Sequence, residues 1–209
     1  MKLFGHDTSP YVRRVRIAFA ELGIPFERDE HGWIDPVAEF LEASPIRRVP
    51  MLDRGPGRAT RYVYDSRVIV ALLYEQKETL SAGPPPFQPT LWEPELDVLD
   101  ENVVSTVDAA LDSLINVFLL EKDGITLAQS SYLERQVERA RSCLAWLDAR
   151  FAGKTSLTPG VLAFADVAVV VAFEWIAFRN RLDLSPWANL RALALAHRER
   201  ASFATTRPA

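Results

Sequence analysis

Cysteine is nearly absent from this sequence, since Cys143 is the single one among 209 residues. One cysteine excludes an internal disulfide framework and dithiol–disulfide exchange through a Cys-x-x-Cys motif. Cys143 falls inside a helically periodic apolar run, residues 133–151, where a packing role is expected. The cysteine content fits a reducing compartment, and we expect a cytoplasmic protein.

The sequence also lacks the residues that several common kinds of functional site require. The three histidines, His6, His31 and His197, are scattered and have no carboxylate or cysteine at ligand spacing, so we expect no metal site. None of the motifs GxxxxGK[ST], GxGxxG or GxSxG occurs. The usual equipment for phosphoryl transfer, hydride transfer and Ser-His-Asp hydrolysis is therefore missing.

The chain also has no long uninterrupted apolar run. The N-terminus MKLFGHDTSPY has no signal-peptide core, and the most apolar stretch, residues 161–178, is broken by Asp166 and Glu174. Because this stretch is short for a bilayer span, we expect a buried helix and no membrane partner. The net charge of −4 argues against a nucleic-acid partner.

Charge is divided unevenly along the chain. Residues 1–77 carry 12 Lys and Arg against 11 Asp and Glu, whereas the remainder carries 12 against 17. An anionic ligand would therefore bind more favourably to the first part, which has the more positive net charge. The alternative for Arg13, Arg14 and Arg16 is an ordinary solvated helix face.

Local signals divide the chain into two domains. Short strands alternate with helices over residues 1–77 in the order βαβαββα, which predicts a small α/β domain with a mixed sheet. Residues 78–90 contain SAGPPPFQP and are predicted to be a stiff linker. Beyond it, residues 91–209 show no strand signal and are predicted to be all-helical. The expected helices there cover about 94–122, 131–152, 163–180 and 185–200.

The stretch TSPYVRRVRIAF, residues 8–19, opens a helix. Ser9 is a favoured N-cap and Pro10 suits the first helical position, and Gly23 ends the apolar periodicity. No histidine motif accompanies Ser9 as a base. If Ser9 acts chemically, it acts as a hydroxyl that donates a hydrogen bond and not as a nucleophile.

Four segments, in order across both domains, resemble the cytosolic glutathione S-transferase family, especially its tau class and related bacterial serine-type enzymes. They are SPYVRRVRIAFAELGIPFE at 9–27, SPIRRVPML at 44–52, YDSRVI at 64–69 and LAFADVAVV at 162–170. The resemblance implies a thioredoxin-like N-terminal domain and an all-helical C-terminal domain. It further implies glutathione as cosubstrate and no metal.

The resemblance also implies roles for particular residues. Ser9 would stabilise the glutathione thiolate, with Thr8 and Tyr11 as alternative hydroxyls. Val49 would pair its backbone with the cysteinyl part of glutathione, presented by a cis Pro50. The remaining contacts would come from Asp65 and Ser66 at the γ-glutamyl end, and from Arg48, with Arg47 as its neighbour, at the glycyl carboxylate. Asp65 and Ser66 are equally compatible with a plain helix cap.

A small hydrophobic electrophile would bind between the domains, near Tyr11, Ser105 and Ala109. The implied reaction is thiolate attack on a soft electrophile or a peroxide, and the implied assembly is a homodimer. An isomerase or dehalogenase could use the same site, and a non-catalytic ligand-binding or regulatory protein could share the fold. Two departures from the family pattern are Ala163, where Ser or Thr is usual, and Asp65, where many classes have Glu.

Overall fold

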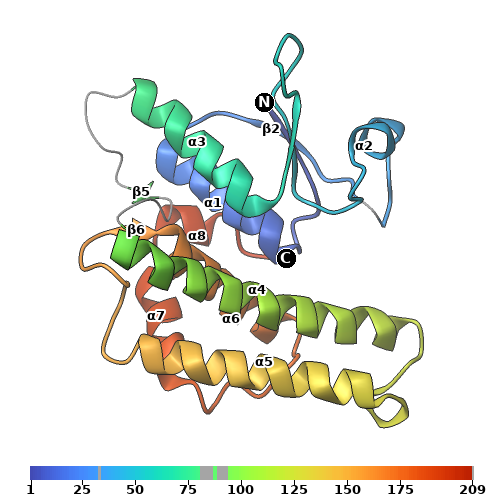
Figure 1. Cartoon of the computed structure of the whole chain (residues 1–209), viewed down its shortest axis with the longest axis vertical. Helices are drawn as coiled ribbons and strands as arrows, with labels where there is room; N and C mark the ends of the chain where they lie inside the picture. The colour runs from blue at the N-terminus through green and yellow to red at the C-terminus, as the bar shows by residue number, and fades with distance from the viewer. Residues whose placement is uncertain (33, 81–86, 89–93, 209) are drawn as a thin grey trace.

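The computed structural model describes residues 1–32, 34–80, 87–88 and 94–208. Most of the predicted linker therefore lies outside the described residues. Figure 1 shows two layers of structure, with the elements up to α3 above and the long helices α4 and α5 below.

The N-terminal part has the predicted βαβαββα order. Its elements are β1 (Lys2–Phe4), α1 (Pro10–Leu22), β2 (Glu27–Asp29), α2 (Ala38–Ala43), β3 (Met51–Asp53), β4 (Tyr62–Tyr64) and α3 (Ser66–Leu80). The strand order is β2-β1-β3-β4, with β1 parallel to β2 and antiparallel to β3, and β3 antiparallel to β4. The mixed sheet is confirmed, and α3 continues past residue 77, where the sequence placed the end of the domain.

Helix α1 forms where the local signals predict it. Ser9 has extended backbone and its Oγ accepts a hydrogen bond from the Val12 N–H at 3.4 Å. Gly23 ends the helix in the left-handed conformation, with φ 62°, which costs a glycine little. In Figure 1, α1 and α3 lie side by side, with α2 apart from them.

The C-terminal part is helical, as predicted. Its helices are α4 (Pro94–Lys122), the 3-10 turn η1 (Leu127–Gln129), α5 (Ser131–Arg150), α6 (Phe164–Phe178), α7 (Ala188–His197) and α8 (Ala201–Ala204). The apolar run at 161–178 is confirmed as a buried helix, because nearly all side chains of α6 are buried. The segment Asp100–Lys122 of α4 is long and apolar enough to cross a membrane by length and composition alone. It packs on α5 and α6, as the core helix of a soluble protein also does.

The structure contradicts the expectation of no strand in residues 91–209 at one place, Leu162–Ala163, and it forms a second short strand within the predicted linker, residues 78–90. Residues Phe87–Gln88 form β5, which pairs in parallel with β6 at Leu162–Ala163. The pairing joins segments that are distant in the sequence, and a two-residue strand carries no alternation of its own. Such a bridge is decided by the packing around it and not by local pattern.

The interpretation of Arg13 and Arg14 as part of a solvated helix face is also wrong. Arg13 and Arg14 are 2% and 0% exposed, respectively, although they lie on α1 outside its apolar stripe. Arg14 Nη1 lies 2.6 Å from Asp108 Oδ1 of α4, and Arg13 Nη2 lies 2.5 Å from Glu174 Oε2 of α6. The helical domain covers the second face of α1 and supplies the counter-charges.

Candidate glutathione site

The register of the sheet brings three predicted segments to one edge. Phe4 at the end of β1 pairs with Met51 at the start of β3, which in turn pairs with the end of β4. Ser9 follows β1, Pro50 precedes β3 and Asp65 follows β4. The three segments therefore leave or enter the sheet at the same edge, although 56 positions of numbering separate Ser9 from Asp65.

The loop after β1 makes close contact with the segment before β3. Gly5 has φ 136°, and a Cβ added there would lie 2.4 Å from Val12 Cγ2 and 2.9 Å from Val49 Cβ. A side chain is therefore excluded at Gly5 by space as well as by backbone conformation. Asp7 fixes the same loop through Arg16 Nη1 at 2.8 Å and Arg28 Nη2 at 2.7 Å.

Ser9 is half-buried at the N-terminus of α1. Its Oγ accepts from the Val12 N–H, and its carbonyl accepts from the Arg13 N–H at 3.0 Å. The hydroxyl hydrogen is not used by either bond, so it can be donated. The first turn of a helix also presents free N–H groups and a partial positive charge, which favour an anion.

The segment before β3 presents backbone groups and exposed cations. The Val49–Pro50 peptide bond is cis, as the resemblance implies. Within the described part of the chain, the Val49 N–H and C=O make no hydrogen bond. Arg47 and Arg48 are both exposed, and Arg47 has a positive φ of 51°.

Asp65 and Ser66 begin α3. Asp65 Oδ1 accepts from the Arg67 N–H at 2.8 Å and its carbonyl accepts from the Ile69 N–H at 3.0 Å, so Asp65 caps the helix. Asp65 also has a positive φ of 73°. Ser66 is 3% exposed, and its N–H has no hydrogen-bond partner among the described residues. The cap interpretation is confirmed, and it leaves the second carboxylate oxygen and the Ser66 N–H available.

Tyr11 lies against the helical domain. Its hydroxyl donates to Asp112 Oδ1 of α4 at 2.8 Å. Ala109 and Ser105 precede Asp112 by three and seven positions, which places all three on one face of α4. Burial is the main cause that raises the pKa of Tyr11, and the positive charge of Arg14 opposes it. The phenol therefore stays protonated, with its hydrogen directed at a carboxylate.

Sequence reasoning missed Asp112, Asp108 and the buried role of Arg14. The Arg14 guanidinium lies 4.9 Å from the centre of the Tyr11 ring while it pairs with Asp108. These contacts could not be predicted locally, because the acidic residues on α4 pair with residues on α1 that lie about 100 positions earlier in the sequence. Nothing near TSPYVRRV in the sequence indicates them.

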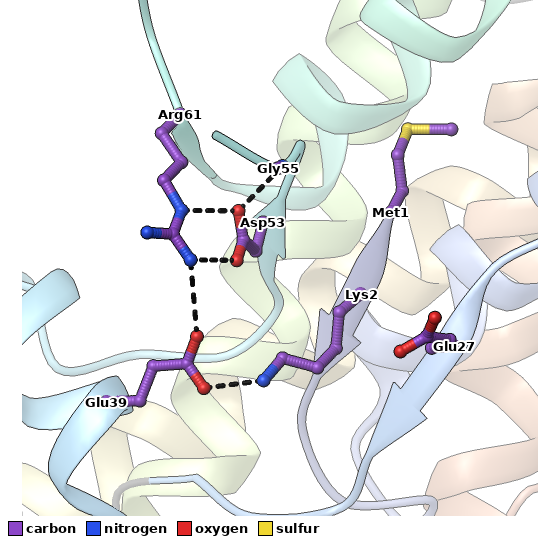
Figure 2. A pocket seen from close by; sticks show the side chains of 7 residues that line it. All are labelled: Met1, Lys2, Glu27, Glu39, Asp53, Gly55 and Arg61. Carbon is purple, nitrogen blue, oxygen red and sulfur yellow. Dashed lines mark hydrogen bonds and ion pairs between the residues drawn. The ribbon is translucent and has the colours of Figure 1, made fainter. Parts of the chain in front are cut away.

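A cavity of about 300 Å³ lies at the opposite edge of the sheet, where β1 begins. Figure 2 shows four of the charged side chains, Lys2, Glu39, Asp53 and Arg61, paired with one another, while Glu27 stands apart. Arg61 is bidentate on Asp53 at 2.9 and 2.7 Å, and Lys2 lies 2.5 Å from Glu39. The hydrogen bond from Arg61 holds the pKa of Asp53 below its ordinary value. None of the predicted site residues lines this cavity, whose wall is completed by Met1, Glu27 and Gly55.

A second, narrow cavity with no room for a water molecule is lined in part by the predicted catalytic residue Ser9. It is lined by Asp7, Thr8, Ser9, Pro10, Arg13, Val171, Trp175 and Pro208.

Among the residues that the structure describes, no group of three or more His, Cys, Asp or Glu is placed to hold a metal ion.

Comparison with known proteins identifies the class. Residues 3–85 match the family described as "Glutathione S-transferase, N-terminal domain", and residues 130–194 match "Glutathione S-transferase, C-terminal domain". The chain belongs to the glutathione S-transferase family. A search of curated proteins found no match.

Solved structures share the fold over the whole chain. A glutathione S-transferase from Methylobacillus flagellatus KT with glutathione bound has a TM-score of 0.84 at 24% identity, covering 100% of this chain and 99% of its own. A glutathione S-transferase from Methylobacterium radiotolerans JCM 2831, in complex with glutathione sulfonate, has a TM-score of 0.82 at 24% identity. The match covers 99% of this chain and 94% of the other. A maleylacetoacetate isomerase from a Methylobacterium, with malonate and glutathione bound, has a TM-score of 0.74 at 20% identity. The match covers 100% of this chain and 96% of the other.

Proposed function

We propose that the protein is a glutathione transferase that binds glutathione at the edge of the sheet defined by Ser9, Val49 and Ser66. The thiolate then attacks a soft electrophile or a peroxide at the boundary between the domains. The observation that supports this most is the convergence of the three segments at one sheet edge, each with an unused polar group.

The geometry suggests how glutathione lies. The free N–H and C=O of Val49 can form an extended backbone pair with the cysteinyl unit. The free Ser66 N–H, at the positive end of α3, can receive the γ-glutamyl carboxylate, and Asp65 can accept from the γ-glutamyl ammonium. Arg48 is exposed on the same edge and suits the glycyl carboxylate.

Ser9 is the best placed hydroxyl for thiol activation. A free cysteine thiol has a pKa of about 8.5, so it is mostly protonated at neutral pH. A pKa about two units lower requires about 2.7 kcal/mol of preferential thiolate stabilisation. The Ser9 hydroxyl and the N-terminus of α1 can supply it together. Tyr11 is less suited, because its hydroxyl hydrogen is donated to Asp112.

The electrophile would lie over Tyr11 and the α4 face that carries Ser105 and Ala109. Attack on an electrophilic carbon forms a carbon–sulfur bond while the leaving group departs with the bonding electron pair. Attack on a peroxide oxygen breaks the O–O bond, releases an alcohol and leaves a sulfenic acid, which a second glutathione converts to the disulfide and water. The similar structures include transferases and an isomerase with glutathione bound, which supports a shared glutathione site. We also propose a cytoplasmic homodimer, a state that light scattering after size-exclusion chromatography measures.

Retention on immobilised glutathione, combined with turnover of 1-chloro-2,4-dinitrobenzene, tests this function. We expect retention, elution by free glutathione and release of chloride at a rate that depends on the enzyme. Arg61→Ala, at the opposite edge of the sheet, is the matched control and should behave as the wild type. Retention without turnover of this or other electrophiles and peroxides would favour the non-catalytic alternative. A protein that is not retained on glutathione and shows no turnover would contradict the proposal.

A further inference from the structure

The end of the described chain lies along the helix that Ser9 begins. We call residues 200–208 the α8 strap. At the far end of α1, Glu21 pairs with Arg200, with 2.6 Å between Oε1 and Nε, and accepts a hydrogen bond from the Ser202 hydroxyl. At the N-terminal end of α1, Pro208 lines the small cavity that Ser9 also lines. Figure 1 shows α8 beside α1 and the chain end beside the start of α1.

Arg13 is the buried junction between α1 and this strap. Its Nε donates to Thr206 Oγ1 at 3.3 Å and its Nη2 donates to the Phe203 carbonyl at 3.3 Å. The same Nη2 lies 2.5 Å from Glu174 Oε2 on α6. Only 2% of Arg13 is exposed, so its two hydrogen bonds and its ion pair with the partly exposed Glu174 form largely away from water, where charged contacts are stronger. Arg13 Nη1 has no hydrogen-bond partner among the described residues.

The junction is one helical turn from Ser9. The Arg13 N–H donates to the Ser9 carbonyl, and Arg13 lines the cavity together with Thr8 and Ser9. Among the residues that the structure describes, the Ser9 hydroxyl has only the long 3.4 Å contact with the Val12 N–H to hold it. Its position is therefore set mainly by where the first turn of α1 lies, and a small misplacement of a catalytic group is costly.

We propose that Arg13 is a positioning residue for the Ser9 hydroxyl, acting through its buried junction with Glu174 and the α8 strap. This inference rests on the proposed role of Ser9 in glutathione activation. Arg13 does not touch the thiol. It holds the first turn of α1 against α6 and the strap, so that the Ser9 hydroxyl stays directed at the sulfur.

The test measures the pKa of the thiol of bound glutathione, from its ultraviolet thiolate absorbance against pH, together with kcat and the melting temperature. The variants are Arg13→Met, Arg13→Lys and Thr206→Val. Thr206→Val removes the contact of Thr206 with Arg13, together with the bonds from the Thr206 hydroxyl to the Ser202 and Phe203 carbonyls. It leaves the Arg13–Glu174 pair intact, so it stays informative if Arg13→Met does not fold. Arg200→Met removes the ion pair of the strap with Glu21 at the far end of α1, where the Ser202 hydroxyl still contacts Glu21, and is the matched control.

We expect Arg13→Met to raise the thiol pKa by about 0.5 to 1 unit, which lowers the thiolate fraction about 3- to 10-fold below that pKa. Thr206→Val should give a smaller rise, and Arg13→Lys should fall between Arg13→Met and the wild type. Arg200→Met should lower the melting temperature and leave the thiol pKa unchanged. In the double variant Ser9→Ala/Arg13→Met the pKa should equal that of Ser9→Ala, because Arg13 acts through Ser9.

Two results would overturn the inference while the proposed function stands. One is an unchanged thiol pKa in Arg13→Lys and Thr206→Val although Ser9→Ala raises it. The other is an Arg13→Met shift that persists in full in the Ser9→Ala background. If wild-type protein neither binds glutathione nor lowers its pKa, the proposed function fails, and this inference fails with it.

Discussion

Replacement of Ser9 by alanine separates the two roles that its position allows. The variant loses a helix cap and a hydrogen-bond donor at the same time. A lost cap typically costs about 0.5 to 2 kcal/mol. The 3.4 Å contact with the Val12 N–H is long, so we expect about 0.5 kcal/mol here and a melting temperature lower by roughly 1 to 2 °C.

The donor role predicts a much larger effect on the thiol. A hydrogen bond to a charged group contributes about 1.5 to 3 kcal/mol. At about 1.36 kcal/mol for each pKa unit, its loss raises the pKa of bound glutathione by about one to two units. Below the wild-type pKa the thiolate fraction, and kcat with it, should then fall about 10- to 100-fold.

The assay is a spectroscopic titration of bound glutathione with the pH profile of kcat beside it. Tyr11→Phe is the control, because it removes a hydroxyl that is already donated to Asp112. The control should leave the thiol pKa near that of the wild type. If Ser9→Ala lowers the melting temperature and leaves the thiol pKa unchanged, Ser9 is only a cap and our account of activation is refuted.

Two further predictions concern the start of α6. Asp166 accepts the N–H groups of Ala163 and Leu157 at 2.9 Å each, and burial, the largest cause, raises its pKa to about 6. Because the folded pKa is above the unfolded one, the stability that Asp166 contributes is full at acid pH and falls as pH rises from about 4 to 6. We therefore expect Asp166→Asn to cost more at pH 4.5 than at pH 7 in urea unfolding, and an equal cost at both would contradict this. Ala163 has cap geometry without a side-chain acceptor, so Ala163→Ser should stabilise the protein by about 0.5 to 1 kcal/mol in the same assay.

The sequence alone determined the elements whose causes are local. Ser9, Pro10 and Gly23 specify the limits of α1 because capping and left-handed backbone depend on adjacent residues. The apolar run of α6 predicts burial because no face of that helix is polar enough for water. The motif segments likewise indicated the family and the fold before any contact was known.

The tertiary structure decided what depends on residues distant in the chain. Arg13 and Arg14 lie outside the apolar stripe of α1, and a single helix would expose them to water. They are buried because the helical domain covers that face and brings Glu174 and Asp108 to them as counter-charges. A sequence pattern describes one helix at a time and contains no information about which second domain packs on it.

The candidate site shows the same division. The sequence proposed Ser9, Val49 and Ser66 separately, through a resemblance, with nothing local to join them. The register of β1, β3 and β4 brings their segments to one edge of the sheet, because the ends of neighbouring antiparallel strands must meet. The contact of Tyr11 with Asp112 and the course of the α8 strap to Ser9 follow from packing between the domains, and only the folded chain reveals them.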